Sequence, residues 1–166
     1  MKRIIIILSA LAALSGCAKW GSPDSEGESL SKEFEHTGCS GDTRSLITND
    51  PSLLKIKYEH GDLRVTLSNA ELNCAFKELG LKCKAYIEGN VIYYHVVYER
   101  DEEMSANCFC LVEKMTSAVT GLEKGNVYTL QYSVPDFGLK PITFTFNEDL
   151  HQIFDVETLY NIVISE

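Results

Sequence analysis

The sequence is short of positive charge and of the motifs that mark common enzymes. It has 15 lysines and arginines against 24 aspartates and glutamates, and the net charge of −9 argues against binding to nucleic-acid phosphates. It contains no His-Glu-x-x-His pair, no Gly-x-Ser-x-Gly elbow and no phosphate-binding loop. Hydrophobic residues still make up 45% of the 166 residues, so collagen-like and wholly disordered classes are excluded.

The N-terminus has the pattern of an export signal. Lys2 and Arg3 precede an apolar run from Ile4 to Leu14, which is too short for a transmembrane helix of about 20 residues but typical of a signal-peptide core. The run ends in Leu-Ser-Gly-Cys, with the cysteine at position 17. This ending resembles the lipobox of bacterial lipoproteins.

The resemblance implies a mature chain that begins at an acylated Cys17, with palmitate among its acyl chains. Residues 1–16 would then be a cleaved signal peptide, and the membrane would be a partner through the lipid anchor. Lipoproteins of the inner membrane often carry aspartate after the cysteine. Ala18 therefore favours the outer membrane, facing either the periplasm or the cell surface.

Residues 17–44 have the composition of a tether. Serines, glycines and acidic residues dominate, and the few apolar residues follow no period. We therefore expect a lipidated cysteine and a flexible acidic linker over 17–44, followed by one folded domain over 45–166.

The body of the chain alternates between apolar and polar residues in short segments. Leu54, Ile56 and Tyr58 alternate with lysines, and Gly89-Asn90 is a tight-turn dipeptide between two such segments. The alternation changes phase at Ser68-Asn69 and at Glu113-Lys114, which predicts β-bulges or corners there. The pattern predicts an all-β, antiparallel β-sandwich of seven or eight short strands, immunoglobulin-like in type. A small β-barrel is the alternative.

Five cysteines remain besides Cys17, and an exported protein meets an oxidising compartment in which disulfides are the default. An odd number leaves at least one thiol unpaired. The disulfide candidates are Cys39, Cys74, Cys108 and Cys110.

The pairing of these cysteines stays open. Cys108 and Cys110 share one face of an expected strand about 6.6 Å apart, whereas a disulfide needs Cβ atoms about 3.8 Å apart, so each should bond elsewhere. Chain entropy does not distinguish a bridge between Cys74 and Cys110 from one between Cys83 and Cys108.

Two functional hypotheses for the cysteines are alternatives to structural disulfides. One is a zinc site made by Cys74, Cys83, Cys108 and Cys110. Its spacing lacks the paired knuckles of structural zinc sites, so we expect no metal and no other cofactor. The other is a hydrolase in which His95 activates Cys83, but the sequence shows no third group to orient the imidazole.

A second resemblance follows from the order of short cysteine motifs. Gly38-Cys39, Asn73-Cys74 and Cys108-Phe109-Cys110 occur in an arrangement that is similar to small, largely uncharacterised lipoproteins of Bacteroides-type anaerobes. The resemblance implies a β-rich domain without established catalytic residues, and it implies nothing about a ligand. Cys83 is an addition to the pattern, so the resemblance implies that Cys83 is the free thiol.

Three tyrosines are the candidate binding residues. Tyr86, Tyr94 and Tyr98 share one sequence phase, and on an open sheet surface they could stack on sugars or on a protein. If a second sheet covers them they belong to the core, which is the reading we favour.

The sequence favours a non-catalytic binding or interaction module over an enzyme. It shows no catalytic constellation, and a sandwich on a tether presents loops and sheet edges to a protein or glycan partner. The Cys83/His95 hydrolase and a purely structural envelope component are the alternatives.

Overall fold

The computed structural model describes residues 29–40, 50–100, 106–135 and 137–159. These residues form strands and two short helices. The larger elements are β1 (Ser31–His36), β3 (Leu53–Glu59), β4 (Asp62–Asn73), β5 (Leu81–Glu88), β6 (Val91–Tyr98), β7 (Phe109–Val119), β8 (Val127–Val134), β10 (Ile142–Thr145) and β11 (His151–Asp155). The smaller ones are β2 (Cys39–Ser40), β9 (Phe137–Gly138), α1 (Phe76–Leu79) and α2 (Val156–Leu159). Among the described residues, no helix is long and apolar enough to span a membrane.

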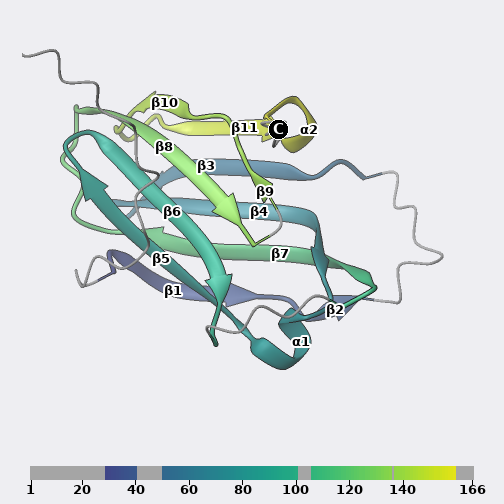
Figure 1. Ribbon diagram of the computed structural model, residues 1–166. Coiled ribbons are helices and arrows are strands. Elements are labelled where there is room, and N and C mark those ends of the chain that lie inside the picture. Colours follow the sequence, from purple (N-terminus) through teal and green to yellow (C-terminus); the bar gives the residue numbers. More distant parts are fainter. Residues whose placement is uncertain (1–28, 41–49, 101–105, 136, 160–166) are drawn as a thin grey trace, which may run out of the picture.

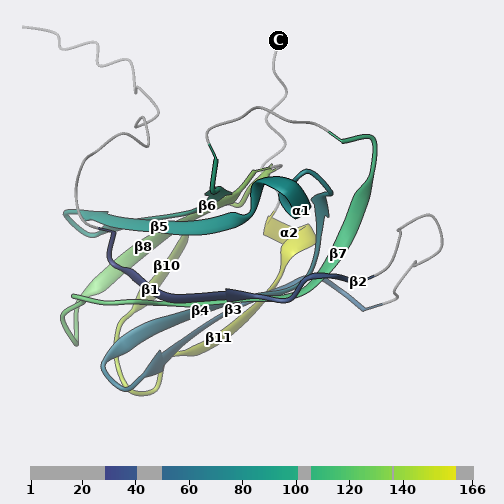
Figure 2. The same cartoon turned by 90° about the horizontal axis from the view of Figure 1, so that it is seen from below.

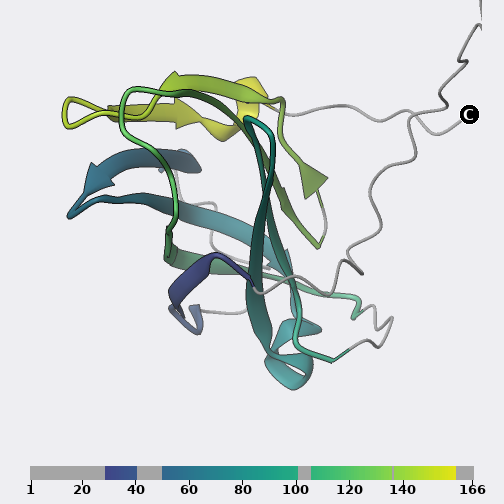
Figure 3. The same cartoon turned by 90° about the vertical axis from the view of Figure 1, so that its left-hand side faces the viewer.

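Two sheets pack face to face, as Figures 1 and 2 show. The larger sheet has the strand order β1-β7-β4-β3-β11, with β2 paired to β7. The smaller sheet has the order β10-β8-β6-β5, with β9 paired to β8. The predicted β-sandwich is therefore confirmed, and the side view in Figure 3 shows its two layers.

Alternation along the strands produces the core between the sheets. Ile56 and Val65 of the larger sheet and Ile92 and Leu130 of the smaller sheet have no exposed surface. Their chain neighbours point outward, as the period of two along a strand requires. The hydrophobic effect therefore holds the two layers together through one continuous cluster of buried side chains.

Two details differ from the predicted strand pattern. The described residues contain eleven strands rather than seven or eight, because two-residue strands and an N-terminal edge strand are added. The pair β6 and β8 is parallel, with Tyr93 opposite Gln131, so this one pair departs from the antiparallel, immunoglobulin-like pattern that the sequence predicts. The long connection through β7 in the other sheet makes the parallel pairing feasible.

In the larger sheet, the phase of the inward-facing residues shifts at the same level in the neighbouring strands β4 and β7. Regular β4–β7 pairs lie on either side, Ser68 with Lys114 and Ala70 with Val112. Between them Asn69 has a positive φ of 53°. The two predicted phase shifts, at Ser68-Asn69 and at Glu113-Lys114, therefore lie opposite each other in paired strands. The same local irregularity shifts the inward-facing phase of both strands.

The N-terminal part of the described chain belongs to the sandwich. β1 pairs with β7 as an edge strand of the larger sheet, and the Leu30 N–H donates to the Ala85 carbonyl of β5 at 2.7 Å. The predicted boundary between a tether at 17–44 and a domain at 45–166 is therefore wrong for residues 31–40. The strand was missed because an edge strand tolerates charged residues, and β1 carries Lys32 and two glutamates. Residues 1–28 and 41–44 lie outside the described residues.

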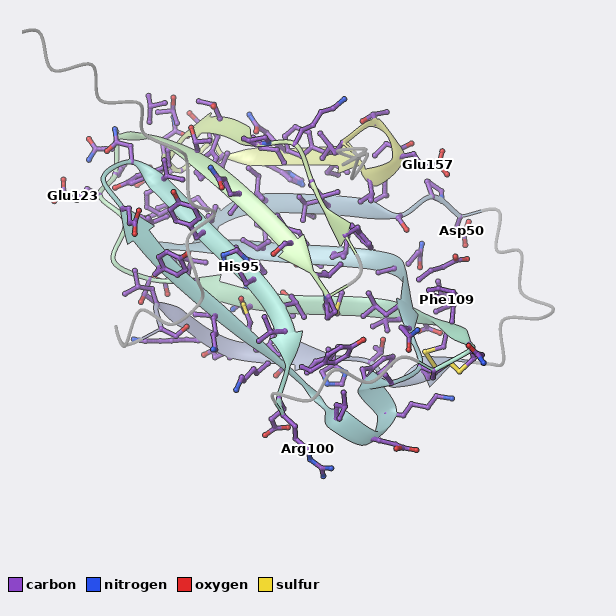
Figure 4. All side chains as sticks on the ribbon, viewed as in Figure 1. Asp50, His95, Arg100, Phe109, Glu123 and Glu157 are labelled. Carbon is purple, nitrogen blue, oxygen red and sulfur yellow. A yellow bond between two sulfur atoms is a disulfide. The ribbon has the colours of Figure 1, made fainter. Side chains whose placement is uncertain are left out.

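Two disulfides fasten one end of the sandwich. Cys39 bonds to Cys110, which ties β2 to β7, and Cys74 bonds to Cys108, which ties the end of β4 to the start of β7. Both lie near Phe109 in Figure 4. The expectation that Cys108 and Cys110 bond elsewhere is confirmed. The two specific bridges considered from chain entropy, Cys74–Cys110 and Cys83–Cys108, are wrong.

Candidate functional site

The outer faces of the two sheets, meaning the faces turned away from the core, differ in charge. On the larger sheet, Glu59 accepts hydrogen bonds from Lys57 Nζ at 2.6 Å and from Arg64 Nε at 2.9 Å. The bonds from Lys57 and then from Arg64 lower the pKa of Glu59. This face is a solvated surface of mixed, paired charges.

On the smaller sheet, charged side chains are confined to the edge strand β5. Pairing and burial place alternate residues of β6, β8 and β10 outward. These outward residues are Val91, Tyr93, His95, Val97, Val127, Thr129, Gln131, Ser133, Thr143 and Thr145. None of them is an aspartate, glutamate, lysine or arginine. We call this surface the uncharged face.

Three rings form a cluster at the β5 side of the uncharged face. Tyr86 and Tyr93 are cross-strand partners whose ring centroids are 4.8 Å apart, with 11° between the ring planes. His95 lies 5.8 Å from Tyr86 and 6.3 Å from Tyr93. These spacings are those of favourable aromatic pairs. Tyr86, Tyr93 and His95 are here named the aromatic cluster, and Figure 4 labels His95 on β6.

The imidazole of His95 is held in place from the neighbouring strand. Its Nδ1 is 2.6 Å from Ser133 Oγ of β8, its cross-strand partner. Partial burial, and secondly the charge of Lys84, lowers the pKa of His95. The ring is therefore neutral at pH 7, with one nitrogen that donates and one that accepts.

The phenol of Tyr86 also stays in its neutral form. Burial, followed by the nearby Glu88 carboxylate and Tyr93, raises the pKa of Tyr86. Its hydroxyl therefore keeps both a donor and an acceptor function at every physiological pH.

The three tyrosines singled out from the sequence do not form one surface. Tyr94 is 1% exposed, and its hydroxyl is 2.8 Å from Ser117 Oγ between the sheets. Tyr98 packs against the core from its partly buried position. The favoured core reading is thus confirmed for Tyr94, and only Tyr86 lies on the outer face.

Sequence reasoning missed Tyr93, and it considered His95 only as a base for Cys83. It assumed that even-numbered residues on both sides of the turn share one face of the sheet. The turn at Gly89-Asn90 pairs Glu88 with Val91, so Tyr86 faces Tyr93 rather than Tyr94. The two-residue turn itself carried that information, because its length fixes the register of the hairpin.

Cys83 and His95 are not brought together. Cys83 pairs with Val96 and points to the core, where the Ser117 hydroxyl lies 3.8 Å from its sulfur. Burial raises the pKa of the Cys83 thiol. A partly buried thiol of raised pKa, on the opposite face from the imidazole, does not make a nucleophile–base pair.

The four-cysteine zinc site is replaced by disulfides. Cys74, Cys108 and Cys110 each have a disulfide partner, which leaves Cys83 as the free cysteine among those described. Across residues 29–40, 50–100, 106–135 and 137–159, no group of three or more potential ligands from histidine, cysteine, aspartate and glutamate could hold a metal ion.

Comparison with known proteins gives one match. Residues 1–18 match the family described as a prokaryotic membrane lipoprotein lipid attachment site. No curated protein and no solved structure matches the chain. Cys17 is the only cysteine in the matched segment, which lies outside the described residues. The chain thus carries a bacterial lipoprotein attachment site and is a lipid-anchored protein of the cell envelope.

Proposed function

We propose that this lipoprotein is a non-catalytic binding module whose binding surface is the uncharged face of the smaller sheet. The observation that carries the proposal is the aromatic cluster, which places two tyrosines and a neutral histidine on an outer sheet surface. Tyrosine supplies large contact area with few rotatable bonds, and it is enriched among residues that dominate binding energy.

The proposal includes the anchor and its membrane. Cys17 is the acylated residue, with palmitate among its chains, and Ala18 directs the protein to the outer membrane of a Bacteroides-type bacterium. The lipid holds the sandwich at the membrane, so the uncharged face meets envelope or extracellular partners at high local concentration.

Site-specific photocrosslinking in the producing bacterium tests the binding surface. The photoreactive residue p-benzoylphenylalanine replaces Tyr93 in one strain and Ile153 in another. Ile153 is the matched control, since it is 55% exposed on the outer face of the larger sheet. Adducts at position 93 and few at position 153 are expected. Equal yields at both positions, or none at position 93, would contradict the proposal.

The anchor has a separate test. Substitution Cys17→Ser should abolish labelling with a radioactive fatty acid and release the protein from the membrane fraction. A labelled, membrane-bound variant would show that the acyl chain is attached elsewhere.

A further inference from the structure

We infer that the uncharged face binds a neutral glycan chain, laid across the strands over the aromatic cluster. This inference rests on the proposed binding function and adds the chemical class of the ligand. Three features of the face carry it: its charge, its hydrogen-bonding groups and its shortage of large apolar side chains.

The charge of the face disfavours an ionic partner over most of its width. No acid or base projects from the outer side of β6, β8 or β10, whereas the larger sheet displays ion-paired lysine, arginine and glutamate. Over β6, β8 and β10, a charged ligand would lose its hydration without gaining a counter-charge. On β5, the residues that flank Tyr86 are Lys84 and Glu88, whose opposite charges favour neither an anion nor a cation. A neutral ligand does not incur that loss.

The hydrogen-bonding groups of the face match hydroxyls. Tyr86, Tyr93, Ser133 and Thr129 carry hydroxyls, Gln131 carries an amide, and His95 is neutral. Each of these groups can both donate and accept a hydrogen bond. Some of these groups already bond within the face, His95 Nδ1 to Ser133 Oγ and Thr129 Oγ1 to Thr143 Oγ1. The donors and acceptors that remain match sugar hydroxyls, which also do both.

The shape and apolar content of the face favour a glycan over a protein. Large hydrophobic side chains that are strongly exposed in the described chain are Phe109, Val127 and Ile153, and only Val127 lies on this face. The other outward valines, Val91 and Val97, are only partly exposed, so the face offers a small apolar centre for a protein interface. The rings of Tyr86 and Tyr93 instead provide modest apolar surface for the C–H groups of a sugar.

The row of polar and aromatic groups is long enough for several sugar units. Tyr86 pairs with Tyr93, Tyr93 with Gln131, and the neighbouring Thr129 with Thr143, so the row crosses all four long strands of the smaller sheet. Strand spacing makes this about 14 Å. We therefore assign a chain of sugars rather than a monosaccharide.

Binding of defined oligosaccharides to the full lipidated chain in detergent micelles tests the inference. The neutral probes are cellohexaose, xylohexaose, maltohexaose and mannohexaose, and the anionic probe is hexagalacturonate. Saturable binding of at least one neutral probe is expected, with little change between about 50 and 300 mM salt because no ion pair forms. Failure to bind every neutral probe, or preference for hexagalacturonate, would overturn the assignment.

Variants locate the site. Tyr93→Ala should weaken binding at least about tenfold, through loss of ring contact and its hydroxyl, and Tyr93→Phe should weaken it less. Ile153→Ala, which removes an equally exposed apolar side chain from the larger sheet, should leave binding unchanged. If Tyr93→Ala does not fold, His95→Gln and Tyr93→Phe provide the same comparison. Full affinity in the folded variants would place the glycan elsewhere and overturn the inference.

The two proposals fail in different ways. Crosslinking at position 93 to a protein, with no neutral oligosaccharide bound, would keep the uncharged face as the binding surface and reject the glycan. An absence of both crosslinks and glycan binding would reject both proposals.

Discussion

Cys83 and His95 lie on opposite faces of the smaller sheet, because Cys83 pairs with Val96 and His95 pairs with Lys84. One residue of register separates the two faces of any strand pair. The thiol therefore belongs to the core, beside Ser117 and Tyr94, and the imidazole belongs to the aromatic cluster. The β5–β6 hairpin therefore places the candidate nucleophile, Cys83, and the candidate base, His95, on opposite sides of the sheet.

Cys83 should react slowly in the folded protein. Its side chain is partly buried and the pKa of its thiol is raised, so the reactive thiolate is scarce at pH 7 to 8. Iodoacetamide should modify it rapidly only in denaturant, and mass spectrometry should then find one alkylated cysteine outside the acylated Cys17. After reduction, four more should react. Rapid labelling of the native protein would contradict this placement.

His95 should titrate below its ordinary value of 6.5. Burial disfavours the charged ring, and Lys84 adds repulsion. The unfolded chain then binds the proton more readily than the folded one, so the free energy of unfolding is unaffected above pH 6.5 and falls as pH drops from there through the folded pKa. NMR titration of the ring gives the pKa directly.

Two variants separate the causes of this shift. Lys84→Met should raise the pKa of His95 without restoring it fully, because burial remains. His95→Gln should flatten the loss of stability below pH 6.5. A ring that titrates at or above 6.5 would refute the burial seen in the structure.

Much of the sandwich was predictable because its strands are half-buried. Alternation located β3, β6, β8 and β10, and both phase slips in β4 and β7 appear at one bend. The edge strand β1 was not predicted, because an edge strand exposes most of its side chains and so resembles a linker in composition.

The candidate site was harder to predict than the fold. It depends on pairing between strands, and pairing is set by register rather than by composition. The parallel neighbours β6 and β8 bring Ser133 to His95 across 38 positions of sequence, which no local pattern encodes. The disulfide partners likewise follow from which strands adjoin β7.

Asn73 should be a strong determinant of stability. It is 7% exposed, its Oδ1 accepts from the N–H groups of Ala75 and Ala106, and its Nδ2 donates to the Ala106 carbonyl at 2.8 Å. Asn73→Ala leaves these backbone groups without their partner and should cost about 3 kcal/mol. Urea unfolding measures the loss. The exposed neighbour Asn107→Ala is the control, and an equal effect of both would contradict the role of Asn73.

Each disulfide should contribute substantially to stability. Cys39–Cys110 spans 71 positions and Cys74–Cys108 spans 34. Loop-closure entropy then gives about 4 kcal/mol for each, with slightly more for the longer loop. Paired serine substitutions, one bridge at a time, should lower the urea midpoint by comparable amounts. Unchanged midpoints would mean that the bridges do not restrict the unfolded chain.

The N-terminal boundary of the folded domain gives the last prediction. A chain of residues 46–166 lacks β1, β2 and Cys39. It also loses a seam of hydrogen bonds between the N-terminal segment and the two sheets, in which Ser29 Oγ and the Leu30 backbone bond to the backbone of Ala85 and Thr120. Loss of the Cys39–Cys110 bridge alone removes about 4 kcal/mol, a large share of a typical stability of about 5–15 kcal/mol. We therefore expect residues 46–166 to show little cooperative unfolding by circular dichroism.

A chain of residues 29–166 is the matched control for this truncation. It retains both strands, the seam and the bridge, so it should unfold cooperatively with the midpoint of the unlipidated mature chain, residues 17–166. Since Cys110 loses its partner in the shorter chain, that chain should also contain one more free thiol than the control. Equal midpoints for residues 29–166 and 46–166 would place the boundary where composition alone suggested it, and would remove β1 and β2 from the cooperative unit.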